Sequence, residues 1–183
     1  MGDDQTALIV PALDVEPLVG AFRLRHSADA RAGVPAHLTI MFPFLEPAAV
    51  SDEALRALES LFAAEPAFDY MLVAVREFGD GGVIYLAPEP AEPFVLLTEL
   101  VAARFGVKPY AGAYVDPVPH LTVGEGLPPN ERERVAGALH RALPLPAHAS
   151  QAWLMVGRTE RTWTRRHAFP FAAHARFAAH ALR

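Results

Sequence analysis

The chain has 183 residues, of which 52% are hydrophobic and 20% charged, and its formal net charge is −5 at pH 7. This composition supports one sizeable core, or two small lobes that share one, and so excludes a disordered chain. The acidic balance gives no general attraction for a long nucleic acid, since proteins that bind one normally carry a strongly basic domain or stripe.

The sequence also argues against a protein held by disulfides or a thiolate metal site, and against a secreted or membrane-spanning protein. Cysteine is absent, so there are no disulfides and no thiolate metal site. The N-terminal apolar run Ala7–Leu13 is short and broken by Pro11, so it fits neither a signal peptide nor a membrane span. We therefore expect a cytoplasmic monomer that binds neither DNA nor a membrane.

The chain opens with a strand and a helix. The run Ala7–Leu13 predicts a strand that lies near a sheet edge or ends early, because of Pro11. Asp14 is a candidate N-cap for a helix that reaches about His26, and Pro17 fits the first turn of that helix.

A second helix and a hairpin follow further along. Ser51 is a capping residue for an amphipathic helix that runs to Phe62. The segments Phe68–Phe78 and Val83–Ala87 then predict a β-hairpin around the glycine-rich turn 79–82.

The most informative stretch of the chain occurs twice. His37-Leu-Thr-Ile is preceded by Val34-Pro-Ala, and 83 residues later His120-Leu-Thr-Val is preceded by Val118-Pro. In a strand, residues i and i+2 point to the same face, so each histidine projects together with the threonine that follows it. We therefore expect His37 with Thr39, and His120 with Thr122, to present two matching pairs of side chains.

The repeat extends beyond these motifs. Glu16-Pro17 matches Glu92-Pro93 at an offset of 76, so the second half carries a seven-residue insertion, which falls in 106–117. The order strand, helix, motif strand, helix, two strands then occurs twice, with one strand bridging the copies. Such self-similarity indicates two lobes related by an approximate twofold axis, with the motifs facing each other where the lobes meet.

The elements expected in the second half follow from this alignment. They are helices at about 93–105 and 129–142, and strands at 120–124, 148–157 and 161–170. The alanine-rich segment 171–183 favours a terminal helix.

Two histidines and two threonines suit one kind of chemistry. A histidine pair that flanks one phosphorus centre can accept and donate a proton in a single step, as cleavage of a phosphodiester requires. Threonine hydroxyls are neutral donors suited to the non-bridging phosphate oxygens. This scheme needs no metal and no cofactor.

The paired motifs His37-Leu-Thr-Ile and His120-Leu-Thr-Val, with Pro43-Phe44 after the first, resemble the two-histidine phosphoesterase superfamily, specifically its 2′-5′ RNA ligase-like and cyclic phosphodiesterase branch. The resemblance implies a bilobal α+β fold, with two pseudo-twofold-related lobes of antiparallel sheet, helices packed outside and a central cleft. It implies catalytic roles for His37, Thr39, His120 and Thr122. This chain has Phe42 where many relatives place tyrosine, so a hydrogen bond from that position is missing.

From this resemblance we expect residues 1–183 to form a single two-lobed phosphoesterase-like domain, with motif strands at about 36–42 and 119–124. The expected activity is that of a metal-independent phosphodiesterase or 2′-5′ RNA ligase-like enzyme. Its substrate would be a 2′,3′-cyclic phosphate or a 2′-5′ phosphodiester of a nucleotide or a short RNA end. The direction of the reaction, and which histidine is the acid, stay open.

Three alternatives stand beside this prediction. Glu125 and Asp116 could complete a metal site with the two histidines, although threonine is a poor metal ligand. A non-catalytic module that binds a nucleotide or RNA end could keep the cleft without turning anything over. A purely structural partner protein would have no phosphate-binding cleft.

No repeated motif identifies the residues that would contact the substrate. The candidates are Tyr110, Tyr114, Phe42 and Arg161, although ordinary packing also explains the aromatic ones. Arginines crowd the last predicted hairpin around Trp163, either as a basic stripe for a phosphate backbone or as a solvated strand face: Arg158, Arg161, Arg165 and Arg166. The histidines outside the motifs are expected at the surface: His26, His140, His148, His167, His174 and His180.

Overall fold

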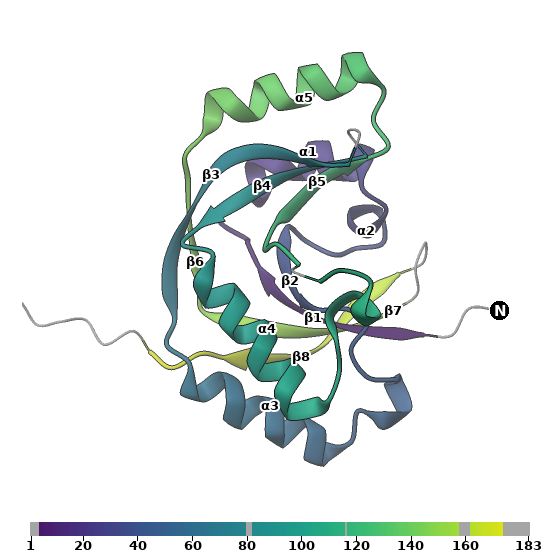
Figure 1. The fold of residues 1–183 in the computed structure, drawn as a ribbon, viewed down its shortest axis with the longest axis vertical. Helices are drawn as coiled ribbons and strands as arrows, with labels where there is room; N and C mark the ends of the chain where they lie inside the picture. The colour runs from purple at the N-terminus through teal and green to yellow at the C-terminus, as the bar shows by residue number, and fades with distance from the viewer. Residues whose placement is uncertain (1–3, 80–81, 116, 158–161, 174–183) are drawn as a thin grey trace, which may run out of the picture.

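The computed structural model describes residues 4–79, 82–115, 117–157 and 162–173. Over these residues the chain forms two four-stranded antiparallel sheets with helices packed around them (Figure 1). This is the bilobal α+β architecture that the repeat predicts. None of the helices in the described part of the chain is long and apolar enough to span a membrane.

The first half of the chain supplies seven elements in the expected order. They are β1 (Gln5–Pro11), α1 (Glu16–His26), α2 (Ala28–Arg31), β2 (His37–Met41), the 3₁₀ turn η1 (Pro47–Ala49), α3 (Asp52–Ala64) and β3 (Phe68–Phe78). The α3 helix begins where predicted, because the Ser51 hydroxyl accepts a hydrogen bond of 3.2 Å from the Ala54 amide.

The second half repeats this order with additions. Its elements are β4 (Val83–Glu89), α4 (Glu92–Phe105), the 3₁₀ turn η2 (Pro109–Gly112), β5 (Leu121–Glu125), α5 (Pro129–Ala142), β6 (Leu145–Ala149), β7 (Gln151–Gly157) and β8 (Trp163–Pro170). Both α1 and α4 begin with Glu-Pro, since proline in the first turn needs no backbone donor. Gly106 caps the C-terminus of α4, and its φ of 68° places it in the left-handed region that favours glycine.

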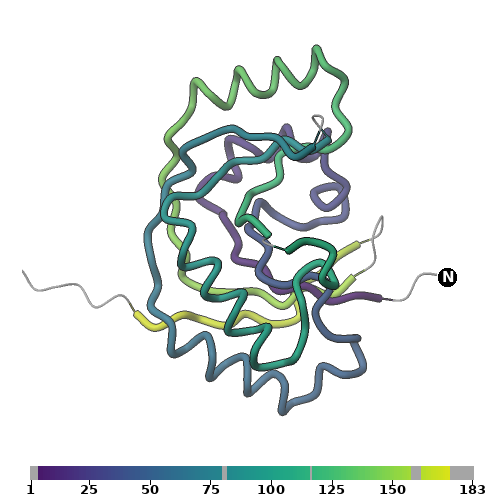
Figure 2. Tube along the Cα trace, viewed as in Figure 1, coloured from purple at the N-terminus to yellow at the C-terminus, as the bar shows by residue number. Residues whose placement is uncertain are grey.

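The two sheets have matching strand orders. One sheet runs β2-β1-β7-β8 and the other β5-β4-β3-β6, so the two motif strands occupy equivalent edges. These edges lie beside each other at the centre of the molecule, where segments from the two halves of the chain converge (Figure 2). The twofold relation inferred from the sequence therefore places the motifs at the lobe interface.

Two of the helices cross between the lobes. The helix α1, which follows β1, packs on β5 of the other sheet, and α4, which follows β4, packs on β2 of the other sheet. The helices α3 and α5 do not cross, since α3 packs on β8 and α5 on β3, each in the sheet of the strand that precedes the helix. Figure 1 shows α3 and α5 along opposite ends of the molecule. Because each motif strand is covered by a helix from the other half, neither half can bury its own apolar surface alone.

A large apolar cluster runs through both lobes. Among its fully buried aromatic residues are Phe62 of α3, Phe94 of α4 and Phe169 of β8, together with Leu38 and Leu121 from the motif strands. The motif strands are thus anchored by their alternate residues, which fixes the direction in which the polar side chains point.

One of the two outcomes expected from Pro11 is found: β1 ends at this residue, inside its sheet and not at the edge. Two details of the sequence-based elements need correction. Asp14 does not cap α1, which starts after Val15 without a side-chain cap; the Asp14 carboxylate instead accepts a hydrogen bond from the His148 amide. The segment expected as one strand at 148–157 is two, β6 and β7, because the chain turns at Ser150 and joins different sheets on either side.

The C-terminal segment is described only in part. Most of the helix expected over 171–183 lies outside the described residues. The described part is not helical, since Ala172 forms an isolated bridge with Pro66.

Candidate functional site

Both motif strands alternate as predicted. In β2, His37 and Thr39 are half-buried while Leu38 and Ile40 are buried, and beside β5 the pair His120 and Thr122 is likewise half-buried. The apolar residues therefore hold the strands in the core, and the polar ones face the space between the sheets.

This space is a cavity of about 600 Å³, which we call the central cleft. All four motif side chains line it: His37, Thr39, His120 and Thr122. The structure thus brings together the residues that the two copies of the motif single out, although they lie 83 positions apart in the sequence.

The two imidazoles are held in the same way. Nδ1 of His37 lies 2.8 Å from the Pro35 carbonyl oxygen, and Nδ1 of His120 lies 2.7 Å from the Val118 carbonyl oxygen. A carbonyl oxygen can only accept, so each Nδ1 carries the proton and each neutral ring has its lone pair on Nε2. Each histidine can therefore take up or release a proton at Nε2.

The surroundings lower the proton affinity of both rings. Burial lowers the pKa of His37 to about 3, with further lowering by the charge of Arg23 and by His120, against a raising effect of the bond to Pro35. Burial also lowers the pKa of His120, while its bond to the Val118 carbonyl opposes the shift. Both imidazoles are thus neutral bases at neutral pH.

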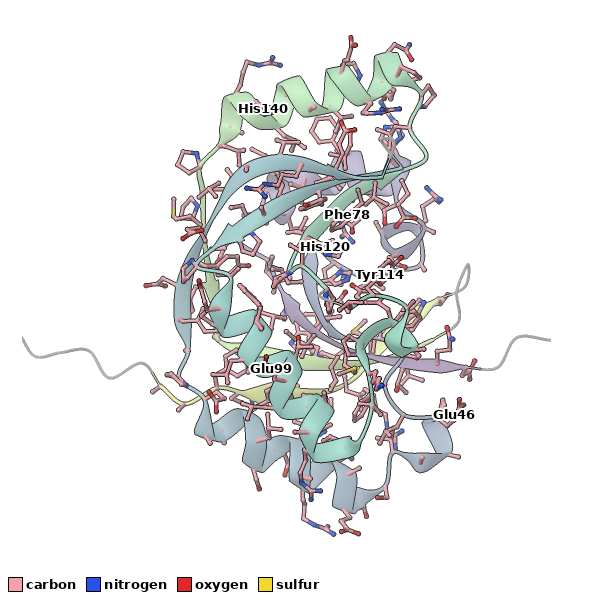
Figure 3. The ribbon with its side chains drawn as sticks, viewed as in Figure 1. Glu46, Phe78, Glu99, Tyr114, His120 and His140 are labelled. Carbon is pink, nitrogen blue, oxygen red and sulfur yellow. The ribbon has the colours of Figure 1, made fainter. Side chains whose placement is uncertain are left out.

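Two aromatic rings that the sequence analysis did not connect to the site hold His120 in place. Phe78 and Tyr85 stack on each other with centroids 4.1 Å apart, and the His120 ring lies edge-on to them at 4.9 and 5.4 Å. Phe78 and His120 occupy the centre of the molecule (Figure 3), whereas His140 lies on the outer helix α5. These contacts restrict the ring of His120 to one orientation.

The aromatic candidates for substrate contact also reach the central cleft. Tyr110, Tyr114 and Phe42 all line it, and the Tyr110 hydroxyl shares a hydrogen bond with Thr39. The Tyr110 amide donates to the Phe42 carbonyl at 2.6 Å, and Tyr110 has a φ of 52°, in the left-handed region that a tyrosine rarely adopts. The segment inserted in the second half is therefore folded back onto the first motif.

The predicted arginine stripe is only partly described, since Arg158 and Arg161 lie outside the described residues. Of its other members, the Arg165 guanidinium lies 4.6 Å from the centre of the Trp153 ring, and Arg166 donates to the carbonyls of Pro47 and Val50. Neither arginine lines the central cleft. Trp163 is buried and does line the cleft, with its ring edge-on to Phe42 at 6.1 Å.

Two carboxylates stand at the wall of the cleft. Asp29 and Glu125 both line it, and burial raises the pKa of each. Among the described residues, no group of three or more histidine or acidic side chains could hold a metal ion. Asp116, which the metal alternative requires, lies outside the described residues.

The histidines outside the motifs are mostly at the surface, as expected, with one exception. His26 is largely buried, with 13% of its side chain exposed, and its Nε2 lies 3.0 Å from a Glu131 carboxylate oxygen. This pair joins α1 to α5. His148 pairs with Asp69 and His167 with Glu59 at the surface, while His174 and His180 lie outside the described residues.

The comparisons with known proteins agree with this architecture. Residues 10–161 match the model of the 2′-5′ RNA ligase superfamily. No curated protein matches the chain significantly.

Several solved structures share the fold. The structure of E. coli LigT complexed with 3′-AMP is 17% identical, with a TM-score of 0.56, and the match covers 93% of this chain and 99% of that one. LigT complexed with phosphate gives 16% identity, a TM-score of 0.55 and the same coverage. TT0787 of Thermus thermophilus is 18% identical, with a TM-score of 0.59, and the match covers 92% of this chain and 98% of that one.

The family model spans most of the chain and includes both motifs, and the likeness to LigT and TT0787 extends over nearly the whole fold. This chain belongs to the 2′-5′ RNA ligase superfamily.

Proposed function

We propose that this protein is a metal-independent phosphodiesterase or 2′-5′ RNA ligase-like enzyme that acts on a 2′,3′-cyclic phosphate or a 2′-5′ phosphodiester of a nucleotide or short RNA end. The observation that carries the proposal is the pair of histidines in one cleft, each with Nδ1 bound to a carbonyl and each beside a threonine. A binding module has no need for two imidazoles with the same tautomer in one cleft.

The proposed reaction on a cyclic phosphate is a displacement at phosphorus. One imidazole takes a proton from water through Nε2 as the water oxygen bonds to phosphorus. The bond from phosphorus to one ribose oxygen breaks, and the second imidazole, which must enter the step protonated at Nε2 by uptake of a proton from solvent, gives that proton to the departing oxygen. Thr39 and Thr122 donate hydrogen bonds to the non-bridging oxygens, which gain negative charge in the transition state. With a ribose 5′-hydroxyl in place of water and the 3′-oxygen as leaving group, the same steps make a 2′-5′ bond, and their reverse breaks that bond and re-forms the cyclic phosphate.

The properties of the cleft favour a small substrate. Its volume of about 600 Å³ suits a nucleotide, and Asp29 and Glu125 in its wall disfavour additional phosphates on that side. LigT, which shares the fold, has been seen complexed with 3′-AMP and with phosphate, and this supports a nucleotide as the ligand.

The test is turnover of 2′,3′-cyclic nucleotides and 2′-5′-linked oligonucleotides by wild type, His37→Ala and His120→Ala. Each well-placed acid or base contributes about 10²–10⁴ in rate, so each variant should lose that factor in kcat. His140→Ala, which changes an exposed histidine on α5, is the matched control and should retain full activity.

Three outcomes would contradict the proposal. Equal rates in all four proteins would remove the catalytic role of the histidines. Tight nucleotide binding without turnover would favour the binding module. Activity that is lost in EDTA and restored by added metal would favour the metal alternative.

A further inference from the structure

A carboxylate on α1 bonds the same peptide unit that orients His37. Nδ1 of His37 lies 2.8 Å from the carbonyl oxygen of Pro35, and this carbonyl shares one planar peptide unit with the Ala36 amide. The Ala36 amide donates a hydrogen bond to the Glu16 carboxylate. Because the N–H and C=O of a trans peptide point in opposite directions, the bond to Glu16 fixes the direction in which the Pro35 carbonyl meets the imidazole.

The carboxylate fits beside this peptide because α1 has a glycine one turn further on. Gly20 is buried, and a Cβ at this position would lie 2.7 Å from Oε1 of Glu16. Glycine inside a helix is destabilising relative to alanine, so helix formation alone disfavours this residue here. The glycine instead leaves room for the carboxylate that bonds Ala36.

The same helix also bonds the preceding residue and the second motif. Arg23 lies seven residues after Glu16 and is 1% exposed. Its Nη1 donates to the Val34 carbonyl at 3.2 Å, and its Nε donates to the Thr122 carbonyl of β5 at 3.0 Å. The segment in front of the first motif is therefore bonded to α1 at two points, and α1 is itself bonded to the second motif strand.

The second motif cannot be held through the corresponding peptide. Nδ1 of His120 lies 2.7 Å from the Val118 carbonyl oxygen, but the next residue is Pro119, so the peptide unit that carries this carbonyl has no N–H. The first motif has one residue more between its proline and its histidine, Ala36. The amide of this additional residue makes the contact with Glu16 possible.

We propose that Glu16 is a positioning residue, which acts through the Pro35–Ala36 peptide to hold the His37 ring with its proton on Nδ1 and to leave Nε2 available to the substrate. Gly20 provides the space for its carboxylate. This inference rests on the proposed function, in which His37 exchanges a proton at Nε2. Without the bond to Glu16 the peptide is free to turn, and the imidazole loses the acceptor that selects its tautomer.

Three variants test this role by kinetics. Glu16→Ala removes the acceptor, Glu16→Gln keeps an acceptor oxygen at the same length, and Gly20→Ala displaces the carboxylate while leaving it in the protein. Misplacement of a catalytic group costs up to about a hundredfold, so Glu16→Ala and Gly20→Ala should lower kcat by about tenfold to a hundredfold, with KM within about threefold of wild type. Glu16→Gln should keep most of the activity.

The chain offers a matched control for each change. Glu92→Ala removes the exposed glutamate of the Glu-Pro start of α4, and Gly137→Ala adds a Cβ inside α5. Both should keep full activity. Because alanine favours the helix, Gly20→Ala carries the test even if Glu16→Ala does not fold.

A second readout needs no substrate. Nitrogen NMR spectra of the imidazoles at neutral pH, assigned with His37→Gln, should show wild-type His37 only as the tautomer with its proton on Nδ1. Glu16→Ala and Gly20→Ala should show both tautomers for His37, whereas His120 should keep the wild-type pattern in every variant. A merely structural role for Glu16 would lower the urea midpoint and leave the tautomer of His37 unchanged.

A double variant tests whether Gly20 acts through Glu16. If it does, adding Gly20→Ala to Glu16→Ala should cause no further loss of kcat. Losses that multiply in the double variant would show that Gly20 affects the site independently, and they would contradict the proposed arrangement.

The two proposals fail separately. The tautomer spectra need no turnover, so a protein with the expected spectra but no activity on the cyclic nucleotides or 2′-5′-linked oligonucleotides would contradict only the proposed function. An active enzyme in which folded Glu16→Ala and Gly20→Ala keep both the wild-type kcat and a single His37 tautomer would contradict only the inference about Glu16.

Discussion

The low proton affinity of His37 predicts how stability depends on pH. Its pKa is lowered to about 3 in the folded protein, chiefly by burial, whereas in the unfolded chain it returns to an ordinary value of about 6.5. Below pH 6.5 the unfolded state therefore binds a proton that the folded state does not, and the free energy of unfolding falls as the pH falls.

The size of the effect follows from the same values. Each pH unit below about 6.5 removes about 1.4 kcal/mol, so at pH 5 this histidine has lowered the stability by about 2 kcal/mol. The figure is an upper limit, because His37 is only half-buried and solvent reduces the effect of burial.

Urea unfolding followed by circular dichroism tests this at several pH values from about 7.5 to 5. His37→Gln keeps a polar side chain of similar length but cannot titrate, so its stability relative to wild type should rise by about 2 kcal/mol over this range. His140→Gln serves as the matched substitution at an exposed position. A stability difference between His37→Gln and wild type that stays constant across the whole pH series would refute the lowered pKa.

Changes at three further positions, Thr39, Tyr110 and Gly124, test the cleft and the packing beside it. Thr39→Val should lower kcat by about tenfold to a hundredfold, less than loss of a histidine, and Thr39→Ser should restore most of it, because only the hydroxyl is needed. Tyr110→Phe keeps the ring but removes the hydroxyl bonded to Thr39, so it should lower kcat/KM without changing the urea midpoint; an unchanged kcat/KM would leave Tyr110 a packing role. Gly124→Ala should destabilise the fold by about 1–3 kcal/mol in urea, because its Cβ would lie 2.7 Å from Cβ of His26 on α1. Gly137→Ala, in the α5 helix where a Cβ has room, should instead be neutral or stabilising.

The parts of the fold that the sequence predicts are those with local or repeated patterns. The α3 helix follows from its Ser51 cap and apolar face, and the β3–β4 hairpin from glycines between two apolar strands. The positions of β2 and β5 follow from the repeated motif. Their placement opposite each other also follows from the repeat, because a twofold relation places equivalent residues opposite each other.

The parts that could not be predicted depend on contacts between distant segments. Arg23 looks like any arginine on an amphipathic helix, and only the packing of α1 on β5 buries it. Phe78 and Tyr85 belong to the hairpin and meet His120 because β4 pairs with β5. Asp14 has the residue type of a cap, but its carboxylate binds a backbone amide 134 residues away, which no local pattern can indicate.

The central claim is that both imidazoles act on a single phosphorus centre. The most direct measurement is a crystal structure grown at neutral pH with inorganic phosphate. One phosphate should lie within hydrogen-bond distance of Nε2 of both His37 and His120, with the hydroxyls of Thr39 and Thr122 on its remaining oxygens. A phosphate that contacts only one of the two histidines, or binds outside the central cleft, would contradict the account.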